Sequence, residues 1–210
     1  MLCLRAPRKL LDVPLSARAT PYMANIMKRI AALLFIVPLA TSQAQLSSAR
    51  EDSLASIPSS RQRSAALRTY GQTSDRETLL AVMRIARTIP NSTDKSRLLE
   101  TLAPRYLGNA DLTLSKAYFR VARTVPSSEE LRDLLIAVVP FALKSDDIAT
   151  AIIETARIVP SSPDRSEVLT ALVESDAVRS NDVRELFVEA TQDLPGEKDR
   201  RRVMRAASRH

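Results

Sequence analysis

The sequence predicts an all-α protein made of stacked antiparallel helical hairpins, with four full repeats and a half-repeat at each end. One observation is a recurring proline, preceded by Ile, Val or Leu, with gaps of 32, 36, 34 and 35 residues between successive copies. Periods of this length are typical of repeat architectures. The second observation is that apolar residues follow helical spacing, and no sustained alternation indicates a strand. The unit prolines are Pro58, Pro90, Pro126, Pro160 and Pro195.

The first helix of each unit is expected to begin just after its proline. Serine recurs two residues after the first four unit prolines, and its oxygen can accept a hydrogen bond from a first-turn amide. Pro163 suits a first helical position, and Ser127 with Glu130 forms a capping-box pattern. Apolar pairs follow eight and nine residues after the proline: Ala66-Leu67, Leu98-Leu99, Leu134-Leu135, Val168-Leu169 and Val203-Met204. Pro104 and Pro140 predict a kink or an early stop near the end of this helix.

The second helix of each unit has its own start and stop signals. Acidic or small polar residues open it, and an acid suits the positive end of the helix dipole. The next unit proline ends it, because the residue before a proline is disfavoured in the α region. The predicted starts are Ser74-Asp75, Asn109-Ala110-Asp111, Ser145-Asp146-Asp147 and Ser180-Asn181-Asp182.

These signals divide residues 45–210 into repeats. The full hairpins are expected at 58–89, 90–125, 126–159 and 160–194, followed by a last helix at about 196–208. Residues 46–57 read as the second helix of a preceding unit. Terminal half-units of this kind shield the end hairpins from water.

The N-terminal part carries export signals. An apolar run from Ile30 to Ala40 follows Lys28-Arg29 and precedes a small-x-small site, so residues 27–44 read as a signal peptide cleaved after about Ala44. The run is too short to cross a bilayer, which leaves no transmembrane span in the mature chain. Residues 1–26 form an upstream leader, or Met23 or Met27 is the true start. We expect a periplasmic or secreted protein.

The high net charge of the chain comes from its ends. The full sequence has a formal charge of +7, but residues 1–44 hold six Lys or Arg and one acid. Residues 45–196 hold 19 basic and 21 acidic residues, so the repeat body is nearly neutral. Together with export and 4% aromatics, this argues against nucleic acid as the partner. The only cysteine, Cys3, falls in the leader, so the mature chain has no disulfide.

The repeat unit resembles known helical-hairpin families. Two helices per roughly 34 residues resemble the α-solenoids of the tetratricopeptide and HEAT type, although the tetratricopeptide Trp, Gly and Tyr signals have no counterpart. The phrase Ile/Val-Pro-Ser-Ser-x-x-Arg-Ser-x-x-Leu looks more like helical repeats of certain bacterial envelope proteins. There such repeats usually accompany another module, such as an adhesin-like or membrane-peptidase domain. The resemblance implies a short α-solenoid and transfers no functional residue.

Groups for catalysis are scarce. The one histidine is His210, and only three glycines occur, so no zinc cluster, nucleophile–histidine set or phosphate-binding loop is predicted. The acid pairs Glu129-Glu130 and Asp146-Asp147 lie at helix starts, where capping explains them better than glycosidase chemistry. We therefore predict no enzyme, no metal and no cofactor, with a carboxylate-only site as a minor alternative.

Recurring basic residues are the best candidates for binding. Arg87, Arg123 and Arg157 lie three residues before a unit proline, and Arg63, Lys95 and Arg165 lie five after one. Stacked repeats would align each set along one face. Either these residues pair with neighbouring acids at the surface, where such pairs contribute little, or they form a basic stripe for an acidic partner. A basic C-terminal stretch from Lys198 to Arg209 is a second candidate patch.

The sequence thus favours an exported, non-catalytic interaction module or scaffold of the bacterial envelope, with an unknown protein partner. The alternative is an electrostatic binder of an anionic surface or polymer. That binder would use the arginines and the basic C-terminal stretch.

Overall fold

The computed structural model describes residues 48–72 and 75–209, and these contain ten α-helices and no strand. The all-α prediction is confirmed, and each of the four expected hairpins holds two helices. The expected leader and signal peptide lie outside the described residues. The helices are α2 (Ser48–Ala55), α3 (Ser60–Tyr70), α4 (Arg76–Ala86), α5 (Ser92–Leu107), α6 (Leu112–Ala122), α7 (Ser128–Ala142), α8 (Asp146–Arg157), α9 (Ser162–Glu174), α10 (Asn181–Gln192) and α11 (Glu197–Ala207).

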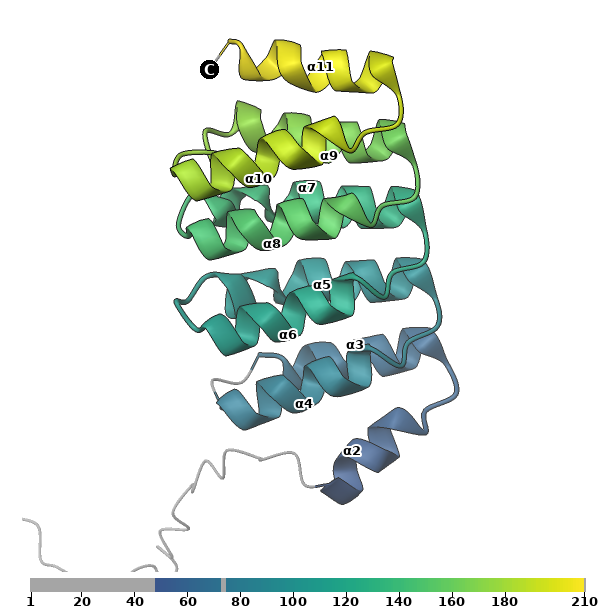
Figure 1. Ribbon diagram of the computed structural model, residues 1–210. Helices are drawn as coiled ribbons and strands as arrows, with labels where there is room; N and C mark the ends of the chain where they lie inside the picture. The colour runs from purple at the N-terminus through teal and green to yellow at the C-terminus, as the bar shows by residue number, and fades with distance from the viewer. Residues whose placement is uncertain (1–47, 73–74, 210) are drawn as a thin grey trace, which may run out of the picture. The chain divides into compact units, whose positions relative to one another are not determined.

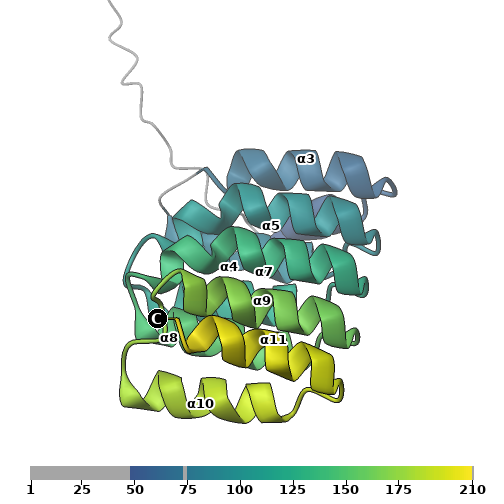
Figure 2. The same ribbon diagram turned by 90° about the horizontal axis from the view of Figure 1, so that it is seen from above.

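The helices of residues 48–209 form two layers in a solenoid-like stack. Helices α3, α5, α7, α9 and α11 make one layer, here called the A layer, and each packs against the next. Helices α2, α4, α6, α8 and α10 make the B layer, which lies in front in Figure 1. Figure 2 shows the A layer from above as a row of helices side by side. Every hairpin therefore presents one helix to each face of the stack.

The core lies between the two layers, on the stripes that the spacing predicts. Three of the predicted apolar pairs are fully buried: Leu98-Leu99 in α5, Leu134-Leu135 in α7 and Val168-Leu169 in α9. In the B layer, Val82, Tyr118, Ile152 and Phe187 are buried at equivalent positions. Two members of the predicted pairs are not buried: Ala66 is half-buried, and Met204 has 52% of its surface exposed.

The helix starts of the A layer correct the sequence-based expectation by one residue. The capping residue is the one directly after the unit proline, as in Ser127, whose side chain accepts from the Glu130 amide. The second serine is already helical. Pro163 consequently occupies the second helical position of α9 and not the first. Glu130 does not complete a capping box, because its carboxylate accepts hydrogen bonds from Thr93 and Ser96 of the preceding repeat.

Of the kink or early stop expected at two prolines, the early stop is wrong. Helix α5 continues through Pro104 to Leu107, and α7 continues through Pro140 to Ala142. A proline cannot donate to the carbonyl four residues earlier, but near a helix end this removes one bond and not a whole ladder. The Gly108 amide donates to the Pro104 carbonyl at 3.1 Å, so the helical turn is maintained beyond the proline.

Candidate functional site

The basic residues five positions after the unit prolines hold the turns between repeats. Arg63 donates to the Ile57 carbonyl in its own turn and to the Thr88 carbonyl in the next turn, at 2.6 and 3.0 Å. Arg165 donates in the same way to the carbonyls of Val159 and Asp193. These guanidinium groups satisfy carbonyls left open where B-layer helices end. Their contacts are therefore mostly with the protein's own backbone.

Lys95 takes the same place in the second repeat and is buried. Its ammonium group donates to the carbonyl and the hydroxyl of Thr124, both at 3.0 Å, and more weakly to the Arg87 carbonyl at 3.4 Å. Burial lowers the pKa of Lys95, and the nearby positive charge of Arg87 lowers it further. A cation in this position stabilises the turn without presenting its charge to solvent.

The residues three positions before the unit prolines lie at the C-terminal ends of α4, α6 and α8. Arg123 forms an ion pair with Glu154 of α8 at 2.7 Å and donates to the Thr155 hydroxyl. Arg157 lies 3.6 Å from Glu189 of α10, the residue equivalent to Glu154 one repeat later, and forms a shorter ion pair with Asp193. In both cases the arginine reaches an acid on the next B-layer helix, located six residues before the next unit proline.

Arg87 departs from this pattern. The position that would hold its acidic partner, six residues before Pro126, is occupied by Arg120. Within residues 48–72 and 75–209, neither Arg87 nor Arg120 has an ion-pair partner within 4.0 Å, and both are exposed. Two like charges therefore face one groove at the place where the next two repeats have an arginine–carboxylate pair.

The groove lies between α4 and α6 and has a volume of about 290 Å³. We call it the α4–α6 groove. Among the described residues that line it, arginines lie beside an apolar floor and none is acidic. The neighbouring groove between α6 and α8, by contrast, contains both Asp147 and Glu154. The α4–α6 groove is lined by Leu80, Met83, Arg84, Arg87, Ala117, Arg120 and Val121.

The sequence-based reasoning missed Arg84 and Arg120. Both lie six residues before a unit proline, where the third and fourth repeats have Glu154 and Glu189. This charge reversal between the N-terminal and C-terminal repeats is visible in an alignment of the units. The alignment does not show what this reversal means, because only the packing of α4 against α6 shows which residues would pair.

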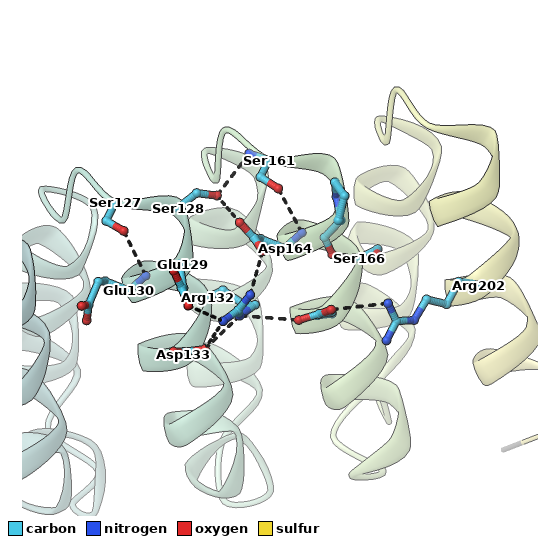
Figure 3. A network of polar contacts seen from close by, with 12 residues as sticks. Ser127, Ser128, Glu129, Glu130, Arg132, Asp133, Ser161, Asp164, Ser166 and Arg202 are labelled. Atoms are coloured by element: carbon cyan, nitrogen blue, oxygen red, sulfur yellow. Dashed lines mark hydrogen bonds and ion pairs between the residues drawn. The ribbon is translucent and has the colours of Figure 1, made fainter.

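The conspicuous Pro-Ser-Ser segments connect repeats and offer no open site. Ser128 donates to Asp164 of α9 at 2.6 Å and accepts from the Ser161 amide at 3.2 Å, as Figure 3 shows. Ser162 repeats the first contact with Asp199 of α11. The hydrogen bond from Ser128 is the main cause that lowers the pKa of Asp164. The second serines of the third and fourth repeats thus link α7 to α9 and α9 to α11.

Arg132 extends this network along the outer side of the A layer. It lies between Asp133 and Asp164, at 2.7 and 2.9 Å. It also contacts Glu167 at 3.5 Å, which in turn lies 3.5 Å from Arg202 of α11 (Figure 3). The charges on this part of the A layer are therefore largely matched by internal partners.

The basic C-terminal stretch is also largely paired. Arg201 and Arg202 form ion pairs with Glu197 and Glu167, and Arg209 lies 3.7 Å from Glu174. Arg200 donates to the Leu194 carbonyl, as the other basic residues at its repeat position do. These contacts reduce the positive field that the stretch can present to a partner.

The acidic residues at the helix starts do not form a metal site in the part of the chain that the structure describes. No group of three or more His, Cys, Asp or Glu side chains there could hold a metal ion. Asp146 and Asp147 lie in the first turn of α8, and Glu130 is held by Thr93 and Ser96, whose hydrogen bonds lower its pKa. Among residues 48–72 and 75–209, no helix is long and apolar enough to span a bilayer.

Comparisons with known proteins add no family to this description. No protein-family model, no curated protein and no solved structure matches the chain. The helical-repeat fold therefore rests on the repeat pattern and on the packing of the helices. The best-supported site is the α4–α6 groove.

Proposed function

We propose that this chain is an exported, non-catalytic helical-repeat protein of the bacterial envelope, which serves as an interaction module or scaffold for another protein. Its hairpins are of the tetratricopeptide- or HEAT-like kind. Such stacks present long surfaces for binding and need no catalytic group.

One observation supports this function above the others. The basic residues of the A layer and of the turns are mostly occupied by internal contacts, whereas the α4–α6 groove in the B layer combines unpaired cations with apolar side chains. Two arginines that line one groove repel each other, so their charges add nothing to the stability of the fold. A partner that supplies a negative charge would pair with these two arginines.

Affinity capture tests the proposal. The tagged full chain, expressed in its native host, is recovered from envelope extracts, and its partners are compared with those of a charge-reversed B-layer variant. We expect an enriched protein that the variant loses. Recovery of no protein above background would refute an interaction module. Export is checked separately by N-terminal sequencing, which should begin near Gln45, whereas an intact Met1 in the cytoplasm would refute it.

The second candidate is an electrostatic binder of an anionic surface or polymer. It is favoured by three exposed cations that have no ion-pair partner within residues 48–72 and 75–209, namely Arg87, Lys116 and Arg120. Binding to anionic vesicles or to polyanions should then fall steeply as salt rises, since exposed charges are screened beyond about 10 Å at 0.1 M salt. A flat salt response, unchanged by reversing Lys198 and Arg205 of α11, would exclude this candidate.

A further inference from the structure

We propose that the α4–α6 groove binds an acidic, amphipathic segment of a partner protein, and that a carboxylate of this segment sits between Arg87 and Arg120. This inference rests on the proposed interaction function and names the site and the chemistry of the partner. It follows from the register of the B layer, from the composition of the groove and from the charges around it.

The alignment of the B-layer helices shows that the α4–α6 interface has an arginine where the next two interfaces have a carboxylate. Each of the next two B-layer interfaces pairs an arginine with a carboxylate of the following helix, as Arg123 does with Glu154 at 2.7 Å. At the α4–α6 interface Arg120 stands in the position of that glutamate. An external carboxylate can therefore take the place that the chain's own acids take in the later repeats. Arginine suits this role, because its planar fork binds carboxylates through two parallel hydrogen bonds.

The apolar floor distinguishes a protein segment from a polymer or a lipid headgroup. Leu80, Met83, Ala117 and Val121 line the same groove as the arginines. The lining continues toward Leu112, which has 43% of its surface exposed. Apolar side chains at helical spacing can pack into such a groove while acidic ones meet its rim. A phosphate group or a sulfated polymer would leave this floor uncovered.

The charges around the groove also favour an acidic partner segment. Lys116 adds a further cation where the lining extends along α6, and no acid lines either part. Arg84 also lines the groove, but it is paired with Glu51 of α2 at 2.8 Å, so its charge is partly matched inside the chain. The groove is thus complementary to negative charge over its whole length, and such complementarity raises both the association rate and the specificity.

The decisive variant is Arg120→Glu. It restores inside the chain the arginine–carboxylate pair seen at the later interfaces, so it should close the site and leave the fold intact. The matched control is Arg68→Glu on α3, which makes the same change in net charge at an exposed arginine of the A layer. Arg68 makes no ion pair within residues 48–72 and 75–209. A melting curve of each variant establishes that it is folded.

The probe is a fluorescently labelled helical peptide as long as α4, with 11 residues, that carries leucines on one face and glutamates beside them. Its binding to the full chain is measured by fluorescence anisotropy. We expect saturable binding that weakens about tenfold or more in Arg120→Glu, since a like charge then faces the peptide's carboxylate. In Arg68→Glu the affinity should change by less than about threefold.

Three results would overturn the inference. One is a peptide affinity weaker than about 1 mM for the unmodified chain. Another is equal loss of affinity in both variants, which would indicate a response to net charge alone. The third is equal binding of a glutamate-only peptide, or of phosphatidylglycerol vesicles, with the same sensitivity to Arg120→Glu. That outcome would assign the groove to anions in general.

Failure here is distinguishable from failure of the proposed function. If affinity capture from envelope extracts still recovers a partner, and Arg120→Glu does not release it, the interaction function stands and the binding surface lies elsewhere. If neither the peptide nor an envelope protein binds, both proposals fail.

Discussion

The link between adjacent A-layer helices makes Ser128→Ala the most informative test of the fold. Ser128 is the first residue of α7, so its loss does not remove the cap, which Ser127 provides. The substitution removes the hydrogen bond to Asp164 at 2.6 Å and the acceptor of the Ser161 amide at 3.2 Å. Ser60 offers a matched control: it occupies the same repeat position in α3, but its hydroxyl makes no hydrogen bond within the described residues.

The expected cost can be worked out from these contacts. A hydrogen bond to a charged acceptor contributes about 1.5–3 kcal/mol, and an amide left without an acceptor costs about 1–3 kcal/mol when buried. Ser128 is half-buried, so water replaces part of both interactions. We therefore expect Ser128→Ala to lower the free energy of unfolding by about 1.5–2.5 kcal/mol. For Ser60→Ala we expect a change within about 0.5 kcal/mol.

The assay is urea unfolding of the full chain, followed by far-ultraviolet circular dichroism. Because repeat stacks gain stability from nearest-neighbour interfaces, Ser128→Ala should also broaden the transition as the third and fourth repeats separate. The Asp164→Ala variant and the Ser128→Ala/Asp164→Ala double variant complete a double-mutant cycle, in which the coupling energy isolates the serine–aspartate bond. Equal effects of Ser128→Ala and Ser60→Ala, or a coupling energy near zero, would refute a structural role for this serine.

Three further predictions test other parts of the structure. Lys95→Met should lower the free energy of unfolding by about 1–3 kcal/mol, because it leaves the Thr124 carbonyl unpaired. Lys95→Arg should keep most of the stability. Equal urea midpoints for the two variants would contradict this prediction. Gly71→Ala should destabilise the protein by about 1–3 kcal/mol, although alanine has the higher helix propensity. The reason is that the new Cβ would lie 2.3 Å from Cδ2 of the fully buried Leu102. A higher melting temperature of this variant in calorimetry would refute the prediction. Folding lowers the pKa of Asp164 and that of Glu130. The stability that the two ionised carboxylates contribute is therefore complete above about pH 5. It is lost as the pH falls below about 4, through the lowered pKa values. The difference in urea midpoint between the unmodified chain and Asp164→Asn should therefore shrink at pH 3, and a constant difference would contradict the assignment.

Most of the fold could be predicted because its signals are local. A proline ends a helix, a serine or aspartate starts the next, and apolar pairs recur one turn apart, all within a few residues of chain. The errors arise where the local signal is ambiguous and a tertiary contact decides. Ser127 and Ser128 are both capable caps, and only the contact from Ser128 to Asp164 in the next repeat decides that Ser127 is the cap. At Pro104 the packing of Leu102 and Leu107 on both sides favours continued helix over an early stop.

The candidate site could be predicted only in part. The sequence singled out Arg87 as a residue left over by the repeat pattern, and the structure places it in the α4–α6 groove. It also singled out Arg63, Lys95 and Arg165, which lie against backbone carbonyls of the turns. Repeat spacing assigns all of these residues to equivalent positions but does not show what each side chain reaches.

By itself, then, the sequence determined the helical hairpins, their number and the positions of the arginines, because these depend on period and on helix-end chemistry. The tertiary structure decided which charges are paired. Arg123 meets Glu154 across two helices, whereas Arg87 shares its groove with Arg120. Such pairing depends on how neighbouring repeats dock, and residues more than thirty positions apart in the chain carry no local signal of it.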